Sequence, residues 1–240
     1  MNRAGLIQQI AIRMDELTPS GEYAVPVDGV GANDNNPLYY TIDNLIDDGV
    51  VELFSVAPYW RLKQSSFDNV VVQDLPDSYR DRDANGPRKL VRLMVPDDFL
   101  RVAEISCPDF QRPITEVVPE QSDEGKRQHN RFLMGKEAKP VGVMSYGQWT
   151  VDQQTVPCRE VDCYSLSDSS TVSPSDVSGT YIAKPGSIDS SAGNTDAVED
   201  VVPLALIPAL CWIVAARTFG ARGDANHAAI CQQNAQNLMV

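Results

Sequence analysis

Hydrophobic residues recur at helical spacing near the start of the chain. Apolar residues three or four positions apart predict a first helix over residues 3–17. A second apolar stripe predicts a helix that begins at Pro37, with Asn36 as its N-cap, and runs to about residue 56. Gly49 lies within this stripe and is a candidate for a break in the helix.

Helical spacing returns at the end of the chain. The strongly apolar run 202–218 predicts a buried helix, and a turn with Asp224 as N-cap leads into a last helix through about residue 238. Small residues follow one side of that last helix, and uncharged amides follow the other. Because small side chains allow close approach, we expect the last helix to pack against the apolar one.

Between about residues 65 and 186 the apolar pattern changes to that of short strands. The segments are rich in Val, Ile and aromatic residues, and Pro, Gly and Asp separate them. This pattern predicts an antiparallel sheet or a small sandwich. The candidate strands are NVVVQDL, KLVRLMV, RVAEISC, ITEVVPE, PVGVMSY, WTVDQQTV and REVDCYSL.

The stretch 166–200 is rich in Ser, Asp and Gly and holds one weak strand candidate, GTYIAKP. Its low apolar content predicts a long irregular loop that neighbouring molecules would order. We therefore expect an α+β fold, in which a helical bundle carries an inserted β module. Residues 1–64 would supply the N-terminal helices, 65–200 the β module with its loop, and 201–240 the helical hairpin that completes the bundle.

The chain is acidic, with a formal net charge of -13. Gripping DNA or an anionic membrane needs clustered Lys and Arg, so the charge argues against both, although not against a protein that DNA merely passes. The odd number of cysteines, five, indicates reduced thiols in a cytosolic compartment. The uncharged run 201–216 is short for a membrane span and holds Pro203 and Pro208, so we expect a core helix and no membrane contact. Polar residues throughout the first apolar pattern are unlike a signal peptide.

Two adjacent carboxylates, Asp97 and Asp98, follow Pro96 between two candidate strands. Adjacent side chains on a turn do not face each other, so this pair is a poor catalytic dyad. We interpret the stretch as a structural turn, one turn of helix that opens at Pro96, with the aspartates at its positive end and Phe99 entering the core. Changing both aspartates to Asn should then affect folding stability alone.

Other candidate sites are weak. Residues 81–86, DRDANG, match only the first half of a calcium loop, and Cys158 and Cys163 have no second pair for zinc. Residues 125–131, GKRQHNR, predict a solvated hairpin tip, with phosphate contact as the alternative. We therefore expect a protein that is not an enzyme, with no catalytic residue, no metal site and no cofactor.

Three stretches carry a family resemblance. They are IDNLIDDGVVELFSVAPYW, LVRLMVPDDFLRVAEI and VPLALIPALCWIVAARTFGARGDANHAAICQQNAQNL. Together they resemble the head–tail adaptor proteins of tailed phages, namely the tail tubular protein A family of podoviruses and ring proteins of crAss-like phages. The resemblance covers about half of the chain. The stretch 166–200 has no counterpart in it.

The resemblance implies a structural virion protein. Such a protein forms a ring, usually of twelve copies, between the portal and the next tail or ring protein, and DNA passes through the centre. The protein would then be located in the neck of the virion, and in the host cytoplasm during assembly. A neutral or negative channel wall would let a duplex slide, which suits the acidic composition.

The resemblance also assigns portal docking to the end of the last helix, where uncharged amides are followed by three apolar residues. The residues are Gln232, Gln233, Gln236, Asn237, Leu238, Met239 and Val240. The alternative function is a non-catalytic β-sandwich module that binds carbohydrate or protein, carried on an oligomerising helical base. An exposed aromatic cluster of Tyr146, Trp149 and Tyr164 would favour this alternative.

Overall fold

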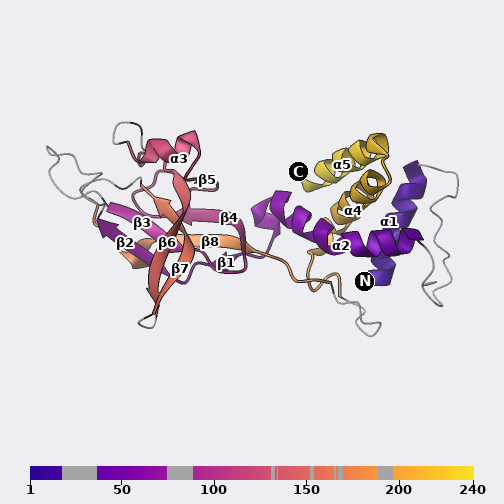
Figure 1. The fold of residues 1–240 in the computed structure, drawn as a ribbon, viewed down its shortest axis with the longest axis horizontal. Helices are drawn as coiled ribbons and strands as arrows, with labels where there is room; N and C mark the ends of the chain where they lie inside the picture. Colours follow the sequence, from indigo (N-terminus) through magenta and orange to yellow (C-terminus); the bar gives the residue numbers. More distant parts are fainter. Residues whose placement is uncertain are drawn as a thin grey trace. The chain divides into compact units, whose positions relative to one another are not determined.

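The protein has an α+β fold, as the sequence predicts. The computed structural model describes residues 1–17, 37–74, 89–130, 133, 135–151, 154–164, 166, 170–188 and 197–240. The chain divides into two compact units, which Figure 1 colours along the sequence. Residues 1–62 and 184–240 form a helical unit, and residues 63–183 form a β unit inserted between its two parts.

The helical unit contains the four helices that apolar spacing predicts. They are α1 (Arg3–Leu17), α2 (Pro37–Val56), α4 (Ile207–Ala221) and α5 (Ala225–Met239), with the short 3-10 helices η1 (Tyr59–Arg61) and η4 (Leu204–Leu206). Asp224 is the N-cap of α5, and its side chain accepts a hydrogen bond from the backbone N–H of His227 at 3.2 Å. The predicted N-cap Asn36 lies outside the described residues.

Helix α4 lies at the centre of this unit and packs against α1, α2 and α5. Its buried residues, among them Leu210, Val214 and Phe219, point to every side of the helix. This explains why its sequence is apolar all round. The segment Leu204–Ala221 is long and apolar enough to cross a membrane by length and composition, but 61% of it is buried inside the protein, as in a core helix.

Gly49 does not break α2, which continues to Val56. The glycine is needed for a close approach instead. A methyl group at position 49 would lie 2.5 Å from Val214 Cγ2 on α4, which is too close for two carbon atoms. Gly49 therefore lets the backbones of α2 and α4 come together.

The first residues of the chain fasten α1 to its surroundings. The Arg3 guanidinium contacts Asp43 at 2.5 Å and Asp47 at 3.0 Å, and it donates to the Ile188 carbonyl at 3.1 Å. The N-terminal amine pairs with Glu199. Residues 184–188 and 197–200 thus belong to the helical unit, so the predicted boundary at residue 200 was too late.

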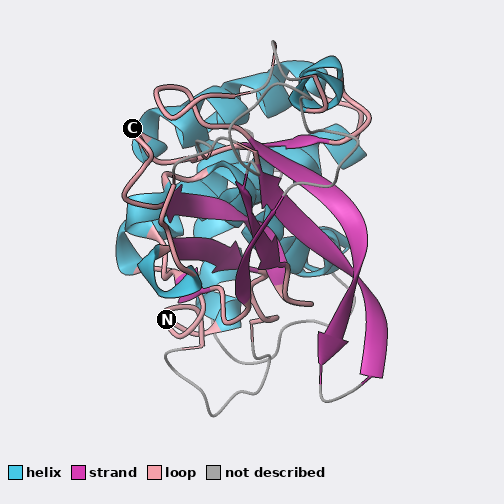
Figure 2. Ribbon diagram, turned by 90° about the vertical axis from the view of Figure 1, so that its left-hand side faces the viewer, coloured by secondary structure: helices cyan, strands magenta, loops and turns pink. Residues whose placement is uncertain are grey.

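The β unit is a sandwich of two sheets (Figure 2). The smaller sheet has the strand order β1-β8-β4 and the larger has the order β2-β3-β7-β6-β5. All pairings are antiparallel except the one between β5 and β6. The strands are β1 (Ser65–Ser66), β2 (Val70–Asp74), β3 (Lys89–Met94), β4 (Phe99–Ser106), β5 (Val117–Pro119), β6 (Gly142–Val151), β7 (Gln154–Cys163) and β8 (Ser178–Ala183).

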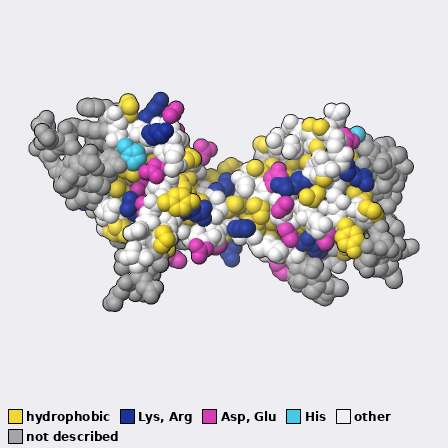
Figure 3. Space-filling model, viewed as in Figure 1, with side chains coloured by type: hydrophobic (Ala, Val, Ile, Leu, Met, Phe, Trp, Pro, Cys, Tyr) yellow, Lys and Arg dark blue, Asp and Glu magenta, His cyan; other side chains and the backbone are white. Residues whose placement is uncertain are grey.

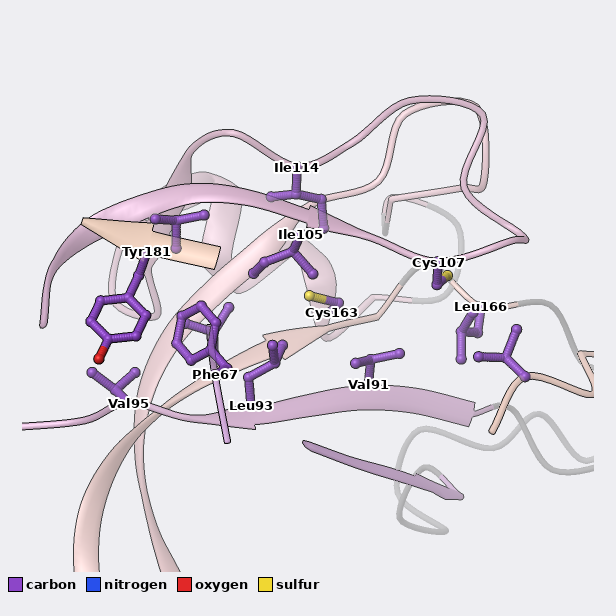
Figure 4. Close-up of a cluster of buried hydrophobic side chains, with 13 residues drawn as sticks. Phe67, Val91, Leu93, Val95, Ile105, Cys107, Ile114, Cys163, Leu166 and Tyr181 are labelled. Atoms are coloured by element: carbon purple, nitrogen blue, oxygen red, sulfur yellow. The ribbon is translucent and has the colours of Figure 1, made fainter. Parts of the chain in front are cut away.

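One apolar core joins the two sheets, as Figure 4 shows. The larger sheet contributes alternate residues such as Leu93 and Val161, and the smaller sheet contributes Ile105 and Tyr181. We call this side of the larger sheet its inner face and the opposite side its outer face. The outer face carries a second, smaller core of Leu90, Val143 and Tyr164.

The structure corrects three predictions about this unit. The segments PVGVMSY and WTVDQQTV are not separate strands, because GVMSY and WTV both lie in the single long strand β6, while the QTV that ends the second segment opens the next strand, β7. The basic run 125–131 does not begin as a hairpin tip, because its residues 125–128 lie in α3 (Asp123–Gln128), which has Ser122 as N-cap. The predicted loop 166–200 is not irregular throughout, because GTYIAKP supplies β8, the central strand of the smaller sheet.

Candidate functional site

The Pro96–Phe99 stretch is a β-turn that carries the chain from β3 in one sheet to β4 in the other. The backbone N–H of Phe99 donates to the Pro96 carbonyl at 3.1 Å, which closes the turn. The predicted single turn of helix is therefore wrong, and so is the helix-dipole role of Asp97 and Asp98. The interpretation as a structural turn remains.

The two aspartates of this turn have different surroundings. Asp98 Oδ1 accepts a hydrogen bond from the hydroxyl of Tyr181 at 3.0 Å. Tyr181 packs against Phe67 and Phe99, with ring centroids 5.0 Å and 5.9 Å away. Burial, and then the neighbouring Asp98 carboxylate, raise the pKa of Tyr181. Both aspartates are exposed, and what sets Asp98 apart is this hydrogen bond, which satisfies the polar end of a core aromatic residue.

The outer face of the larger sheet holds an ionic cluster that sequence reasoning missed. Arg92 on β3 lies between Glu160 and Asp162 on β7. Its Nε and Nη2 atoms contact the two oxygens of Asp162 at 2.6 and 2.7 Å, and Nη2 lies 3.1 Å from Glu160 Oε1. Both carboxylates are buried, with 3% of Glu160 and 2% of Asp162 exposed. Hydrogen bonding to Asp162 is the largest cause of the raised pKa of Arg92.

Two carboxylates, those of Glu160 and Asp162, share the single guanidinium of Arg92. Burial is the largest cause of the raised pKa of Glu160. The negative charge of Asp162 raises this pKa further, while the positive charge of Arg92 lowers it. Trp149 Nε1 donates to Glu160 Oε2 at 3.0 Å, and the Ser145 hydroxyl donates to Oε1 at 3.3 Å. The carboxylate lies over Gly147, where a methyl group would overlap it. Glu160 therefore ties β7 to two positions on β6 and fills the space over a third, Gly147.

Strand alternation is the signal that could have revealed this cluster. In REVDC the charged residues Glu160 and Asp162 alternate with the core residues Val161 and Cys163, and Arg92 alternates in the same way on β3. The pattern places all three charges on one face. Pairing them also requires the register between β3 and β7, which the sequence does not contain.

The cysteines do not form a metal site. Cys158 and Cys163 are an odd number of residues apart on β7, so they point to opposite faces of the sheet. Cys163 is buried in the core, and burial raises its pKa, whereas Cys158 is half-buried on the outer face. Among the described residues no group of three or more His, Cys, Asp or Glu side chains is placed to hold a metal ion. The calcium candidate 81–86 lies outside the described residues.

Helix α3 borders two adjoining open hollows of about 290 Å³ each on the β unit. Basic residues line them, Arg127 and Lys139 among them, but Glu116 and Glu124 lie there too. Figure 3 shows Lys and Arg side chains beside Asp and Glu over this part of the β unit. The mixed charge does not single out a phosphate ligand.

The predicted docking residues at the C-terminus do not all share one surface. Gln232, Gln233, Gln236 and Asn237 are exposed on α5, and so are Leu238 and Val240, at 41% and 95%. Met239 is buried in the helical unit, so its predicted place in an interface is wrong.

The C-terminal end of α5 is held in place by Arg61, a residue that the sequence did not single out. Arg61 on η1 donates to the backbone carbonyls of Leu238 and Val240 at 3.1 and 3.0 Å. A cation at the carbonyl end of α5 also suits the helix dipole. Close to Arg61 in the sequence, Val56 and Trp60 are 56% and 69% exposed.

The aromatic cluster that would favour a sugar-binding or protein-binding module is not present. Tyr164 is buried, and Trp149 is half-buried with its N–H bound to Glu160. Tyr146 pairs with Arg159 on the inner face, opposite to the face of Trp149. Only Tyr146 is largely exposed, at 81%.

No family model matches the chain, and no curated protein does so.

Proposed function

We propose that this protein is a structural head–tail adaptor of a tailed phage, which forms a ring below the portal through which DNA passes. One observation carries the proposal. The β sandwich is inserted into a helical unit whose two parts, residues 1–62 and 184–240, come from the two ends of the chain. The stretches that resemble phage adaptors supply α2, the turn from β3 to β4, and the α4–α5 hairpin.

The exposed side of α5 is the surface we assign to the portal. Gln232, Gln233 and Gln236 are exposed and uncharged in a chain of net charge -13. Amide side chains donate and accept hydrogen bonds together, so they suit a protein interface better than repulsive carboxylates would. The exposed apolar residues Leu238 and Val240 extend this surface to the end of the chain.

The test is binding to the portal protein encoded in the same genome. Gln232→Glu with Gln236→Glu keeps the side-chain size but adds two carboxylates that docking would have to bury without partners. We expect the double variant to keep its circular dichroism spectrum and to bind roughly tenfold more weakly, or worse. Gln9→Glu, at an exposed amide on α1, is the matched control and should bind as the wild type does.

A wild-type protein that does not bind the portal would contradict the function itself. Wild-type binding that the double variant matches would contradict only the assigned surface. Deletion of residues 232–240 is a poorer experiment, because it also removes the buried residues Ala235 and Met239.

A further inference from the structure

The hairpin of β6 and β7 continues beyond the sheet to which it belongs (Figure 2). β5 accompanies β6 only as far as Met144, and β3 accompanies β7 only from about Arg159 onward. Beyond these residues, within the part of the chain that the structure describes, no further strand pairs with either side of the hairpin. We call this two-stranded part, residues 146–151 and 154–158, the arm.

The β6 edge of the arm presents backbone groups for pairing. The backbone N–H of Glu120 donates to the Met144 carbonyl at 3.1 Å, so even-numbered residues of β6 point their backbone groups away from β7. Tyr146 and Gln148 follow at the same spacing, and both are exposed. Their N–H and C=O groups therefore form a strand edge that no described strand covers.

The β7 edge of the arm is protected. The backbone N–H of Val95 donates to the Arg159 carbonyl at 2.9 Å, so odd-numbered residues of β7 point away from β6. Pro157 is one of these residues and has no N–H to offer. Proline on an edge strand hinders the addition of another strand. The β6 edge has neither a proline nor a charged residue between Tyr146 and Val151.

The charge of the arm indicates which molecule can approach it. Residues 146–151 and 154–158 include no charged side chain, although 22% of the whole chain is charged and the net charge is -13. Two copies of so acidic a chain repel each other over most of their surfaces. An uncharged edge with free backbone groups is a place where they can meet without that repulsion.

We propose that the β6 edges of two copies pair with each other, antiparallel, about a two-fold axis at Gln148. Such a contact needs no second surface, because the same segment serves both copies. Pairing of Tyr146, Gln148 and Thr150 across the axis forms about six backbone hydrogen bonds, two for each narrow pair. An isologous contact does not repeat around a ring, so the proposal goes beyond the adaptor function and concerns the free protein.

The first test measures association of the whole chain by light scattering over a range of concentrations. Gln148→Lys places two like charges opposite each other at the axis. We expect dimers of the wild type, association at least roughly tenfold weaker for Gln148→Lys at low salt, and partial recovery at high salt as the charges are screened. Gln148→Thr, which stays uncharged, should dimerise as the wild type does.

The second test locates the axis. In a narrow antiparallel pair the Cα atoms are about 5.5 Å apart, within the range of a disulfide. Gln148→Cys should therefore form an intermolecular disulfide under a mild oxidant, while the wild type, whose least buried thiol is Cys158, should not. The proposal is wrong if the wild type stays monomeric at every concentration, if Gln148→Lys associates like Gln148→Thr, or if Gln148→Cys does not cross-link.

Discussion

At the scale of the residue, Glu160 is the side chain whose charge state matters most. A raised pKa means that the folded protein binds the proton of Glu160 more tightly than the unfolded chain does. The ionised form therefore costs stability above the folded pKa, and this cost fades as the pH falls through that pKa toward the ordinary value of 4.5. This pH dependence of stability is opposite to that of an ion-paired carboxylate with a lowered pKa, whose stabilising effect is lost as the pH falls.

Glu160→Gln should accordingly make the protein more stable than the wild type at pH 7, and the difference should shrink as the pH falls. Glu160→Ala should instead destabilise it by about 1–3 kcal/mol, because Trp149 Nε1 and Ser145 lose their buried acceptor. Urea unfolding of both variants between pH 4.5 and pH 7 measures this. If Glu160→Gln is instead less stable than the wild type at pH 7, and this deficit shrinks at acid pH, then the ion pair with Arg92 outweighs the cost of burying the carboxylate.

The two turn aspartates offer a matched comparison. Asp98→Ala removes the acceptor of the Tyr181 hydroxyl and should cost about 0.5–1.5 kcal/mol in the free energy of unfolding. Asp97→Ala, at the exposed neighbour, should stay within about 0.5 kcal/mol of the wild type. In a Tyr181→Phe background the cost of Asp98→Ala should disappear, since the hydroxyl is gone. Equal costs for the two aspartates would contradict the assigned contact.

At the scale of the element, Gly49 is a point of close approach between α2 and α4. Gly49→Ala should destabilise the helical unit by about 1–3 kcal/mol through overpacking against Val214, despite the better helix propensity of alanine. Val214→Ala should partly rescue it. Gly220→Ala on α4 is the control, because nothing beyond its own stretch of helix lies within 4 Å of the added methyl group. That control should stabilise the protein by about 0.5–1 kcal/mol in thermal or urea unfolding.

Elements with a strong local signal could be predicted, and those set by distant contacts could not. The four long helices follow from apolar spacing, to within a few residues at their ends. Helix α3 has six residues and no apolar stripe, and it depends on the Ser122 cap and on Gly125 fitting against the Pro119 carbonyl. Strand β8 lies in a polar stretch and is held by partners on β1 and β4, far away in the sequence.

The candidate surfaces show the same division. The exposed amides of α5 could be predicted from helical spacing, whereas the burial of Met239 depends on how the helix end packs. The cluster of Arg92, Glu160 and Asp162 needs a register between strands that are about seventy residues apart, and a local pattern does not encode it. The open edge of the arm likewise depends on where β5 ends beside β6.

At the scale of the whole molecule, each unit has its own core. The sandwich core contains residues of the β unit alone. We therefore expect Gly49→Ala to speed amide hydrogen exchange in α2 and α4 and to leave β6 and β7 unchanged. Hydrogen exchange with mass spectrometry resolves these segments. Faster exchange in both units would show that they unfold together.

Electron microscopy of the protein mixed with the portal of the same genome tests the adaptor function most directly. We expect a closed ring of this protein seated on the portal, with α5 and the C-terminal residues Leu238 and Val240 at the contact and the central channel open. Portal particles that stay bare in the presence of excess folded protein would contradict the account.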